Sequence, residues 1–203
     1  MQITSGFKTI LSRPLIYSAF QYLMGSHQIW SFFVKKIIRP KYGDVILDIG
    51  CGPADILNYF PEVDYYGFDI SKSYINKAKK RYGKRGNFFA KSLIFDDLKN
   101  MPKFDLVIAS GVLHHMNDET ARRIFKVAYS ALKPGGRFLT IDPCFTPNQN
   151  AIARFLISND RGKNVRNQKG YQSLCKNIFT DMKINVKHRS WIPYTHCIME
   201  CTK

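Results

Sequence analysis

Short apolar runs alternate along this chain with segments of helical periodicity, from about residue 44 onward. The first run, Val45–Ile49, has the β-branched and apolar character of a parallel strand covered on both faces. Apolar residues recur at helical spacing in 71–82 and 118–132. Further strands are expected at 64–69, 87–90, 104–109 and 137–142. This alternation predicts an α/β fold around a mainly parallel sheet.

Residues 14–38 precede the first strand and repeat apolar and aromatic residues at helical spacing. Gly25 and Ser26 mark the expected break between two helices. Three roles are open for this prefix: it covers a face of the sheet, it forms a lid over a substrate pocket, or it rests on a bilayer as a basic amphipathic helix.

The strand at 45–49 runs directly into Gly50-Cys51-Gly52-Pro53. Glycine allows backbone conformations that are closed to other residues, and it lets a ligand approach the main chain closely. Pro53 suits the first turn of a helix, so residues 54–60 are expected to continue as a helix whose N-terminus points at the turn. Tight strand-to-helix connections also use glycine for steric reasons, so this turn alone is weak evidence for a ligand site.

An acid at the end of the second strand strengthens that interpretation. Asp69 lies 17 residues beyond Gly52 (69 minus 52), where a doubly wound fold places the carboxylate that accepts ribose hydroxyls. Ala54 occupies the third-glycine position of a dinucleotide fingerprint, and no further glycine follows it to cradle a pyrophosphate. The pattern therefore favours a nucleoside without phosphates.

With these features, residues 44–142 resemble the class I S-adenosylmethionine-dependent methyltransferases. The resemblance rests on several motifs in the correct order, which is more specific than any one of them. These are Leu-Asp-Ile-Gly-Cys-Gly-Pro at 47–53, Asp69, Phe-Asp-Leu-Val-Ile-Ala at 104–109, Val-Leu-His-His at 112–115 and Leu-Lys-Pro-Gly-Gly-Arg at 132–137.

The resemblance implies an α/β, doubly wound, seven-stranded Rossmann-like sheet, mostly parallel with an antiparallel final strand, plus N-terminal helices. Residues 1–43 are then an N-terminal helical cap and 44–203 the S-adenosylmethionine-binding domain, in one structural unit. The implied cofactor is S-adenosyl-L-methionine, with S-adenosyl-L-homocysteine as product. The cofactor-binding residues that follow from it are Asp48, Gly50, Gly52, Asp69, Ser92, Leu93 and Ser110.

Two of these assignments carry an alternative. Asp48 either contributes to cofactor binding or caps the glycine turn through backbone amides. Ser92 stands where resembling enzymes often carry an aspartate for the adenine amino group. A serine hydroxyl with the Leu93 amide can still hold adenine, but less strongly because no charge assists the hydrogen bond.

Methyl transfer from a sulfonium is an in-line displacement, so the protein mainly aligns the two reactants and excludes water. An amine acceptor must be neutral, whereas a hydroxyl or an acidic carbon needs a base, for which histidine is suited. The candidates are His114, His115 and His196. Since His114 and His115 are adjacent on a helical start, at most one is expected to face the acceptor.

Residues that flank the expected rim of the sheet are candidates for binding the acceptor. If the last two strands form an antiparallel pair, Tyr194 and His196 reach the same rim as His114 and His115. A carboxylate or phosphate on the acceptor can be bound by Arg154, Arg161 or Arg166. The expected substrate-binding residues are Tyr17, Trp30, Arg154 and Tyr194.

The formal charge of +16 is unevenly distributed. Residues 1–43 carry six basic groups and no acid, 44–142 carry 15 against 12, and 143–203 carry 10 against 3. The flanking segments therefore hold most of the excess. An anionic substrate, a membrane surface and RNA are all admissible partners, as is a merely solubilising surface.

Five cysteines without a Cys-x-x-Cys pair indicate reduced thiols in a cytoplasmic protein rather than disulfides or a zinc site, and no metal is expected. No apolar run is long enough to span a membrane, and peripheral membrane contact is left open.

The leading hypothesis is methyl transfer to a small-molecule acceptor that is lipid-like or anionic, similar to quinone-biosynthesis and natural-product enzymes. An RNA methyltransferase and a non-catalytic binding protein of the same fold are the alternatives. The expected strand at 104–109 is not followed by the Asn-Pro-Pro-Tyr type signature of enzymes that methylate base amines, so a nucleic-acid substrate is not favoured. The sequence leaves the acceptor's identity and the oligomeric state open.

Overall fold

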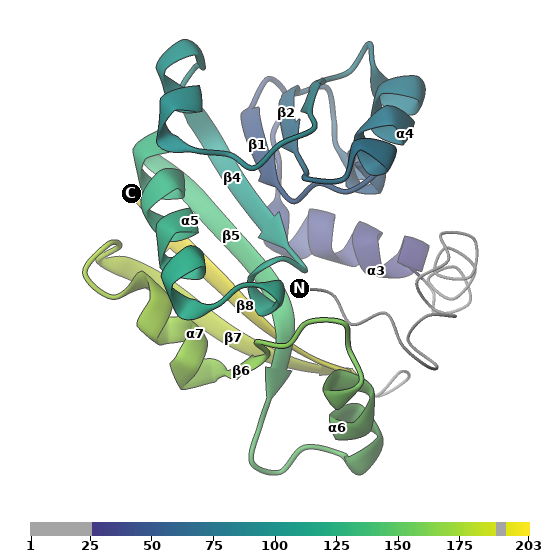
Figure 1. The fold of residues 1–203 in the computed structure, drawn as a ribbon, viewed down its shortest axis with the longest axis vertical. Coiled ribbons are helices and arrows are strands. Elements are labelled where there is room, and N and C mark those ends of the chain that lie inside the picture. The colour runs from purple at the N-terminus through teal and green to yellow at the C-terminus, as the bar shows by residue number, and fades with distance from the viewer. Residues whose placement is uncertain (1–25, 190–193) are drawn as a thin grey trace.

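The structure is a computed structural model that describes residues 26–189 and 194–203. Seven strands form one sheet in the order β3-β2-β1-β4-β5-β8-β7, and a short strand, β6, pairs with the end of β5 (Figure 1). The strands are β1 (Val45–Ile49), β2 (Asp64–Phe68), β3 (Asn87–Phe89), β4 (Phe104–Ser110), β5 (Leu132–Phe145), β6 (Arg166–Asn167), β7 (Asp181–Arg189) and β8 (Tyr194–Thr202).

Strand direction follows the predicted fold class. Only β8 runs antiparallel to its neighbours β5 and β7 in the described sheet, and the other pairings are parallel. The chain turns from β1 to β2 and β3, and then crosses back to β4 on the other side of β1. Ligands of open α/β sheets bind at such a switch point, beyond the carboxyl ends of the strands. The prediction of a doubly wound sheet with an antiparallel final strand is confirmed.

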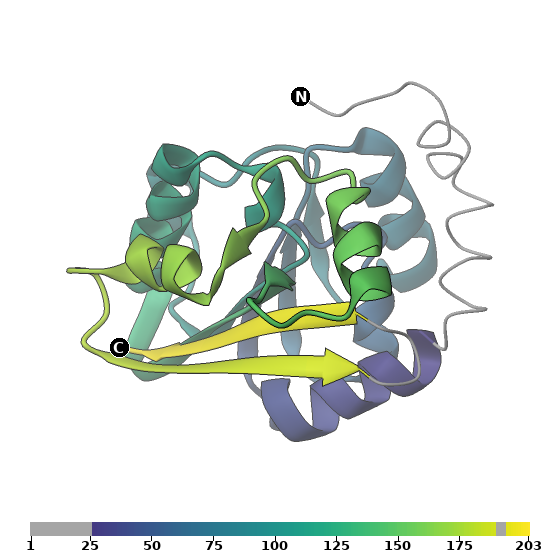
Figure 2. The ribbon, with the colours of Figure 1, turned by 90° about the horizontal axis from the view of Figure 1, so that it is seen from below.

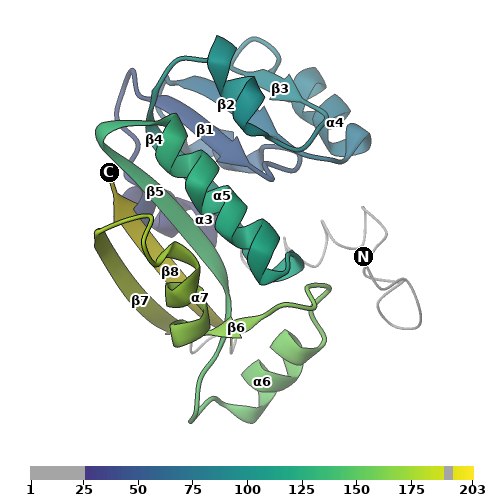
Figure 3. The ribbon, with the colours of Figure 1, turned by 60° about the vertical axis from the view of Figure 1, so that its left-hand side comes forward.

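Helices cover both faces of the sheet (Figures 1 and 3). The helix α5 and the shorter α7 pack on one face with buried Phe125 and Leu174, whereas α3, η1 and α4 pack on the other with Val34 and Ile75. The helical elements are α3 (Ser26–Phe33), η1 (Val34–Ile38), η2 (Asp55–Tyr59), α4 (Lys72–Tyr82), η3 (Phe95–Asn100), η4 (Leu113–His115), α5 (Asp118–Ala131), α6 (Ala151–Ser158) and α7 (Gln168–Cys175).

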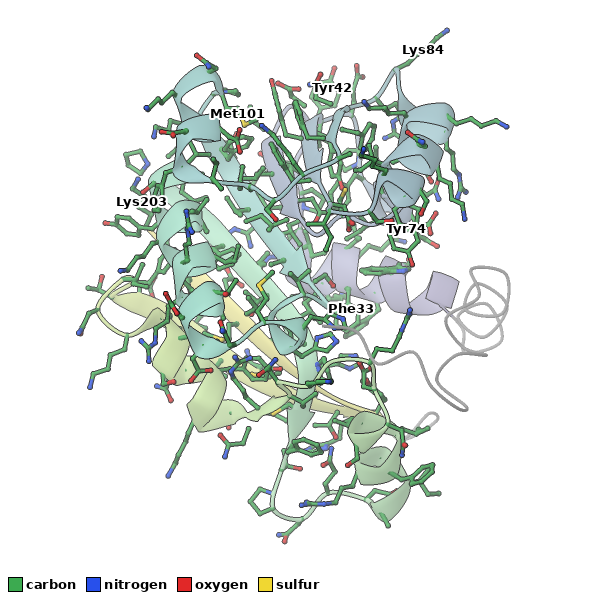
Figure 4. The ribbon with its side chains drawn as sticks, in the orientation of Figure 1. Phe33, Tyr42, Tyr74, Lys84, Met101 and Lys203 are labelled. Atoms are coloured by element: carbon green, nitrogen blue, oxygen red, sulfur yellow. The ribbon has the colours of Figure 1, made fainter. Side chains whose placement is uncertain are left out.

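The described part of the helical prefix covers a sheet face, the first of the three roles left open. Phe33 of α3, labelled in Figure 4, is buried with Val34 and Ile38 of η1 against the central strands. Tyr17 and the expected first helix lie outside the described residues. No helix among those described is long and apolar enough to cross a membrane.

Two local predictions are wrong. Residues 54–60 do not form a regular helix: Ala54 takes the left-handed conformation at φ 59°, and only the five-residue 3₁₀ turn η2 follows. The glycine turn therefore has no long helix pointing at it. In addition, the strand expected at 137–142 is too short, because β5 continues through Pro143 and Cys144 to Phe145. Its last residues pair with β6.

Candidate active site

The glycine turn closes onto the neighbouring strand through its backbone. The amides of Gly50 and Cys51 both donate to the carbonyl of Phe68, at 2.7 and 3.0 Å. Gly50 has φ +75°, and a Cβ there would lie 2.5 Å from Cγ2 of Val112. Gly52, at φ +55°, has open space where its Cβ would stand. Gly50 is thus required for conformation and packing, whereas Gly52 leaves the main chain accessible to a ligand.

Asp69 is fixed by two backbone amides. Its Oδ2 accepts from Gly52 N at 2.9 Å, and its Oδ1 accepts from Ser71 N at 2.8 Å. Ser71 also caps α4 through Tyr74 N. A carboxylate oxygen has two lone pairs, so each oxygen of Asp69 keeps one for a further donor. The half-buried carboxylate is therefore positioned to accept two hydroxyls beside Gly52.

Asp48 is buried below the turn and does not cap it. The turn's amides donate to Phe68 and Asp69, while Oδ2 of Asp48 accepts from the hydroxyl of Tyr65 at 2.6 Å. The interpretation of Asp48 as a cap of the glycine turn is wrong. Burial raises the pKa of its carboxyl to about 7 despite the Tyr65 hydrogen bond. The carboxyl of Asp48 is thus partly protonated at neutral pH, and it lies beneath the glycine turn.

The segment after β3 presents an apolar edge that the sequence analysis missed. Ser92 is exposed, while the side chain of Leu93 is buried in the core. The next residues, Ile94 and Phe95, each keep 42% of their surface exposed. Two exposed apolar side chains directly after a strand end are the sequence signal for this edge. Ser110, the last residue of β4, is half-buried at the same end of the sheet.

Beyond β4, His114 is held between two carboxylates. Its Nδ1 lies 2.8 Å from Oδ1 of Asp142, and its Nε2 lies 3.3 Å from Oδ1 of Asp160. Burial alone lowers the pKa of His114, but the two carboxylates outweigh it and raise the pKa to about 9. His114 is therefore a cation at neutral pH, and both ring nitrogens are engaged. This arrangement suits positioning rather than proton acceptance.

The polar segment between α6 and β6 folds back onto His114. Asp160 also accepts from the hydroxyl of Tyr194 at 2.9 Å, which brings the start of β8 to this rim as predicted. Asn164 N donates to the carbonyl of His114 at 2.9 Å. A Cβ on Gly162 would lie 2.0 Å from Cδ2 of His114, so only glycine fits this approach.

Arg166 ties the same segment to the start of α5. Its guanidinium donates to the carbonyls of Leu113 and Met116 and to the carboxylate of Asp118, at 2.7 to 3.0 Å. These contacts use the planar donor fork of arginine. Arg166 was a candidate for binding an acidic group of the acceptor. The structure gives it a structural role instead.

His115 stands next to this network and is exposed. Its ring centroid lies 4.0 Å from that of His114. Partial burial and the neighbouring His114 cation lower the pKa of His115 to about 4. Of the two adjacent histidines, His115 is thus the neutral and accessible one.

The remaining candidates have different surroundings. His196, in β8, packs edge-to-face on Phe33 at 5.7 Å and beside Tyr194 at 5.0 Å. Trp30 is half-buried against the core from α3. Arg154 is exposed on α6, with its guanidinium 5.6 Å from the ring of Phe145. These contacts place His196 in an aromatic cluster, and they leave Arg154 accessible.

One grouping in the described chain has metal-ligand spacing. One ligand atom from each of His114, His115 and Asp160 lies within 4.8 Å of the others. Both ring nitrogens of His114 are already committed to carboxylates, so we assign no metal here.

Sheet order, switch point and glycine turn define a doubly wound nucleoside-binding α/β protein. A family model described as "Methyltransferase domain" matches residues 47–138. The matched residues include the motifs on which the resemblance to class I S-adenosylmethionine-dependent methyltransferases rests, and the match supports that resemblance.

Proteins with similar sequences agree with this resemblance. The chain is 32% identical over 142 residues to a ubiquinone/menaquinone biosynthesis C-methyltransferase from Desulfotalea psychrophila, covering 66% of this chain and 54% of that one. It is 27% identical over 170 residues to an O-methyltransferase from Penicillium expansum, covering 74% and 59%. The chain thus spans little more than half the length of these relatives.

The S-adenosylmethionine-dependent methyltransferase SibL superposes with a TM-score of 0.69 at 17% identity, over 97% of this chain and 61% of that one. This match shows the shared fold.

S-adenosylmethionine is the cofactor of this class, and the described residues fit it. The open space above Gly52 admits a ligand to the backbone, and Asp69 keeps two lone pairs for the ribose hydroxyls.

Proposed function

We propose that this chain transfers a methyl group from S-adenosylmethionine to a small, amphipathic acceptor that carries a hydroxyl and an anionic group. The observation that carries the proposal is the neutral, accessible His115 beside the fixed His114 cation. His115 offers a proton acceptor at the carboxyl edge, and the exposed guanidinium of Arg154 on α6 offers a positive charge for the anionic group.

The cofactor side of the proposed site consists of Gly50, Gly52 and Asp69, with Ser92, the Leu93 amide and Ser110 along the same edge of the sheet. When bound, the cofactor supplies a methyl group activated by its sulfonium. The chain holds the nucleoside through Asp69 and the glycine turn, and it aligns the acceptor oxygen with the methyl group. Asp48 supports the turn from below through Tyr65.

On the acceptor side, a ring nitrogen of His115 accepts the hydroxyl proton as the oxygen attacks. Above a pH of about 4 this imidazole is neutral and able to do so. His114 fixes the ring of His115 by close contact. Asp142 and Asp160 hold His114 in place, so these carboxylates are positioning residues.

The amphipathic character of the acceptor is supported by α6, which packs beside β5 and β8. It exposes Ile152 and Phe155, at 59% and 67%, together with Arg154. Apolar surface combined with a guanidinium suits a molecule with a hydrocarbon part and a carboxylate or phosphate. The relative from Desulfotalea psychrophila is named for ubiquinone/menaquinone biosynthesis.

The test is methyl labelling in cell extracts. The full chain is incubated with methyl-deuterated S-adenosylmethionine and with separated lipid and aqueous extracts, and labelled products are identified by mass spectrometry. We expect a labelled, acidic, lipid-extractable compound. Label found only in RNA, or in no product, would contradict the proposal.

With the acceptor identified, His115→Gln is compared with the parent. We expect kcat to fall by about two orders of magnitude, with S-adenosylhomocysteine affinity unchanged. The rate of the parent should be level from about pH 5 to 8 and fall near pH 9, where His114 loses its proton. An unchanged kcat in His115→Gln would refute the role of His115 as base.

A further inference from the structure

A hollow of about 240 Å³ lies away from the candidate active site, between the helical prefix and the outer strands β7 and β8. It is on the sheet face that α3 and η1 cover. Figure 2 shows α3 running beside the end of β7 rather than across the whole of that strand. We call this feature the cationic hollow, and the residues that define it are Phe32, Lys36, Ile37, Lys183, Lys187 and Ile198.

Strand β7 presents two different faces. Met182, Ile184 and Val186 are half-buried and pack against the core under α5 and α7. The alternate residues Lys183 and Lys187 are exposed on the opposite face and line the cationic hollow. Since side chains alternate along a strand, the core packing of the first set fixes the lysines toward the hollow.

The charge of the hollow is strongly positive. Arg39, Asn185 and Glu200 complete its lining, and Glu200 is the one carboxylate among the described residues there. That carboxylate is bound by Arg39 at 2.8 Å and by Arg137 at 3.3 Å. The ion pairs of the described chain thus leave Lys36, Lys183 and Lys187 with no acid of their own, and these ammonium groups are available to an anionic partner.

Apolar side chains lie beside these cations. Phe32 keeps 47% of its surface exposed, four residues before Lys36 on the same helical segment. Ile37 and Ile198 complete the apolar lining. An exposed aromatic side chain next to lysines is typical of helices that lie at a bilayer surface, where the ring enters the headgroup layer and the ammonium groups meet lipid phosphates.

We propose that the cationic hollow docks this chain on a bilayer surface that contains anionic phospholipid. Headgroup phosphates contact Lys36, Lys183 and Lys187, and Phe32 enters the interfacial layer. A polynucleotide fits less well. Lys183 and Lys187 stand about 13 Å apart along the strand, and Phe32 is the one ring in the lining, whereas single-stranded nucleic acids need successive stacking platforms.

The experiment is vesicle flotation of the full chain with phosphatidylcholine vesicles, with and without phosphatidylglycerol. The double variant Lys183→Gln/Lys187→Gln removes two charges from the hollow. The control Lys79→Gln/Lys80→Gln removes two exposed charges from α4. Each lysine near an anionic surface contributes about fivefold to binding, so we expect roughly 25-fold weaker binding of the hollow variant. The control should bind within about threefold of the parent.

The proposal is overturned if the parent does not float with phosphatidylglycerol vesicles, or if the control loses as much binding as the hollow variant. It is also overturned if a single-stranded RNA oligonucleotide binds more tightly than the vesicles and loses its binding in the hollow variant. S-adenosylhomocysteine binding should be equal in all three proteins, so failure of the docking proposal is distinguishable from failure of the proposed methyl transfer.

Discussion

The proposed cofactor side and the proposed acceptor side of the candidate active site are built by different interactions. On the cofactor side, Gly50, Gly52 and Asp69 are linked through main-chain amides over 17 residues of sequence. On the acceptor side, His114 is joined by charged side chains to Asp142, 28 residues away, and to Asp160, 46 residues away (160 minus 114). The first depends on conformation that glycine permits, and the second on buried charges that must remain paired.

This difference predicts that the acceptor side is the more sensitive to a single substitution. His114→Asn should destabilise the fold by about 4 kcal/mol, because Asp142 and Asp160 lose the cation that compensates their buried charge. Urea unfolding followed by circular dichroism measures the change. The double variant His114→Asn/Asp160→Asn should recover part of the loss. Equal stability of parent and His114→Asn would show that the pairing is unimportant.

On the cofactor side, Gly50→Ala should cost about 3 kcal/mol. The new Cβ would meet Val112, and φ +75° is unfavourable for alanine. Val112→Ala in the same chain relieves the contact but not the backbone strain. We therefore expect the double variant to be more stable than Gly50→Ala, and less stable than Val112→Ala alone. A double variant equal to Val112→Ala would attribute the whole effect to packing.

A smaller effect is expected from the buried acid of the cofactor side. The pKa of Asp48 is raised in the folded chain to about 7, so the folded state binds more protons than the unfolded state between pH 4 and 7, and stability falls as pH rises. Between pH 5 and pH 7 this loss should be about 2 kcal/mol. Asp48→Asn should remove it, as measured by unfolding at both pH values. If Asp48→Asn loses as much stability between pH 5 and pH 7 as the parent does, another group causes the pH dependence.

The two sides also differ in how far the sequence predicts them. The strands, Gly50, Gly52 and Asp69 follow from local patterns, since apolar periodicity and a glycine turn act over a few residues. The pairing of His114 with Asp142 and Asp160 does not follow from local patterns: no motif singled out Asp160, and Arg166 was expected to bind the acceptor. Which side chains meet across such separations depends on how residues 159–167 fold back, and no short-range pattern encodes that.

Asp48 shows the same limit within a motif. The motif correctly placed Asp48 near the end of β1. Its hydrogen-bond partner, however, is Tyr65 on the neighbouring strand β2, and not the glycine turn that follows Asp48 in sequence.

The most direct test of the account is the affinity of Asp69→Ala for S-adenosylhomocysteine, measured by isothermal titration. The two hydroxyl hydrogen bonds to this carboxylate should contribute about 3 to 5 kcal/mol, so we expect the dissociation constant to rise by roughly 200-fold or more in a protein that keeps its circular dichroism spectrum. A folded Asp69→Ala protein that binds the nucleoside within twofold of the parent would contradict the assignment of this edge as the cofactor site.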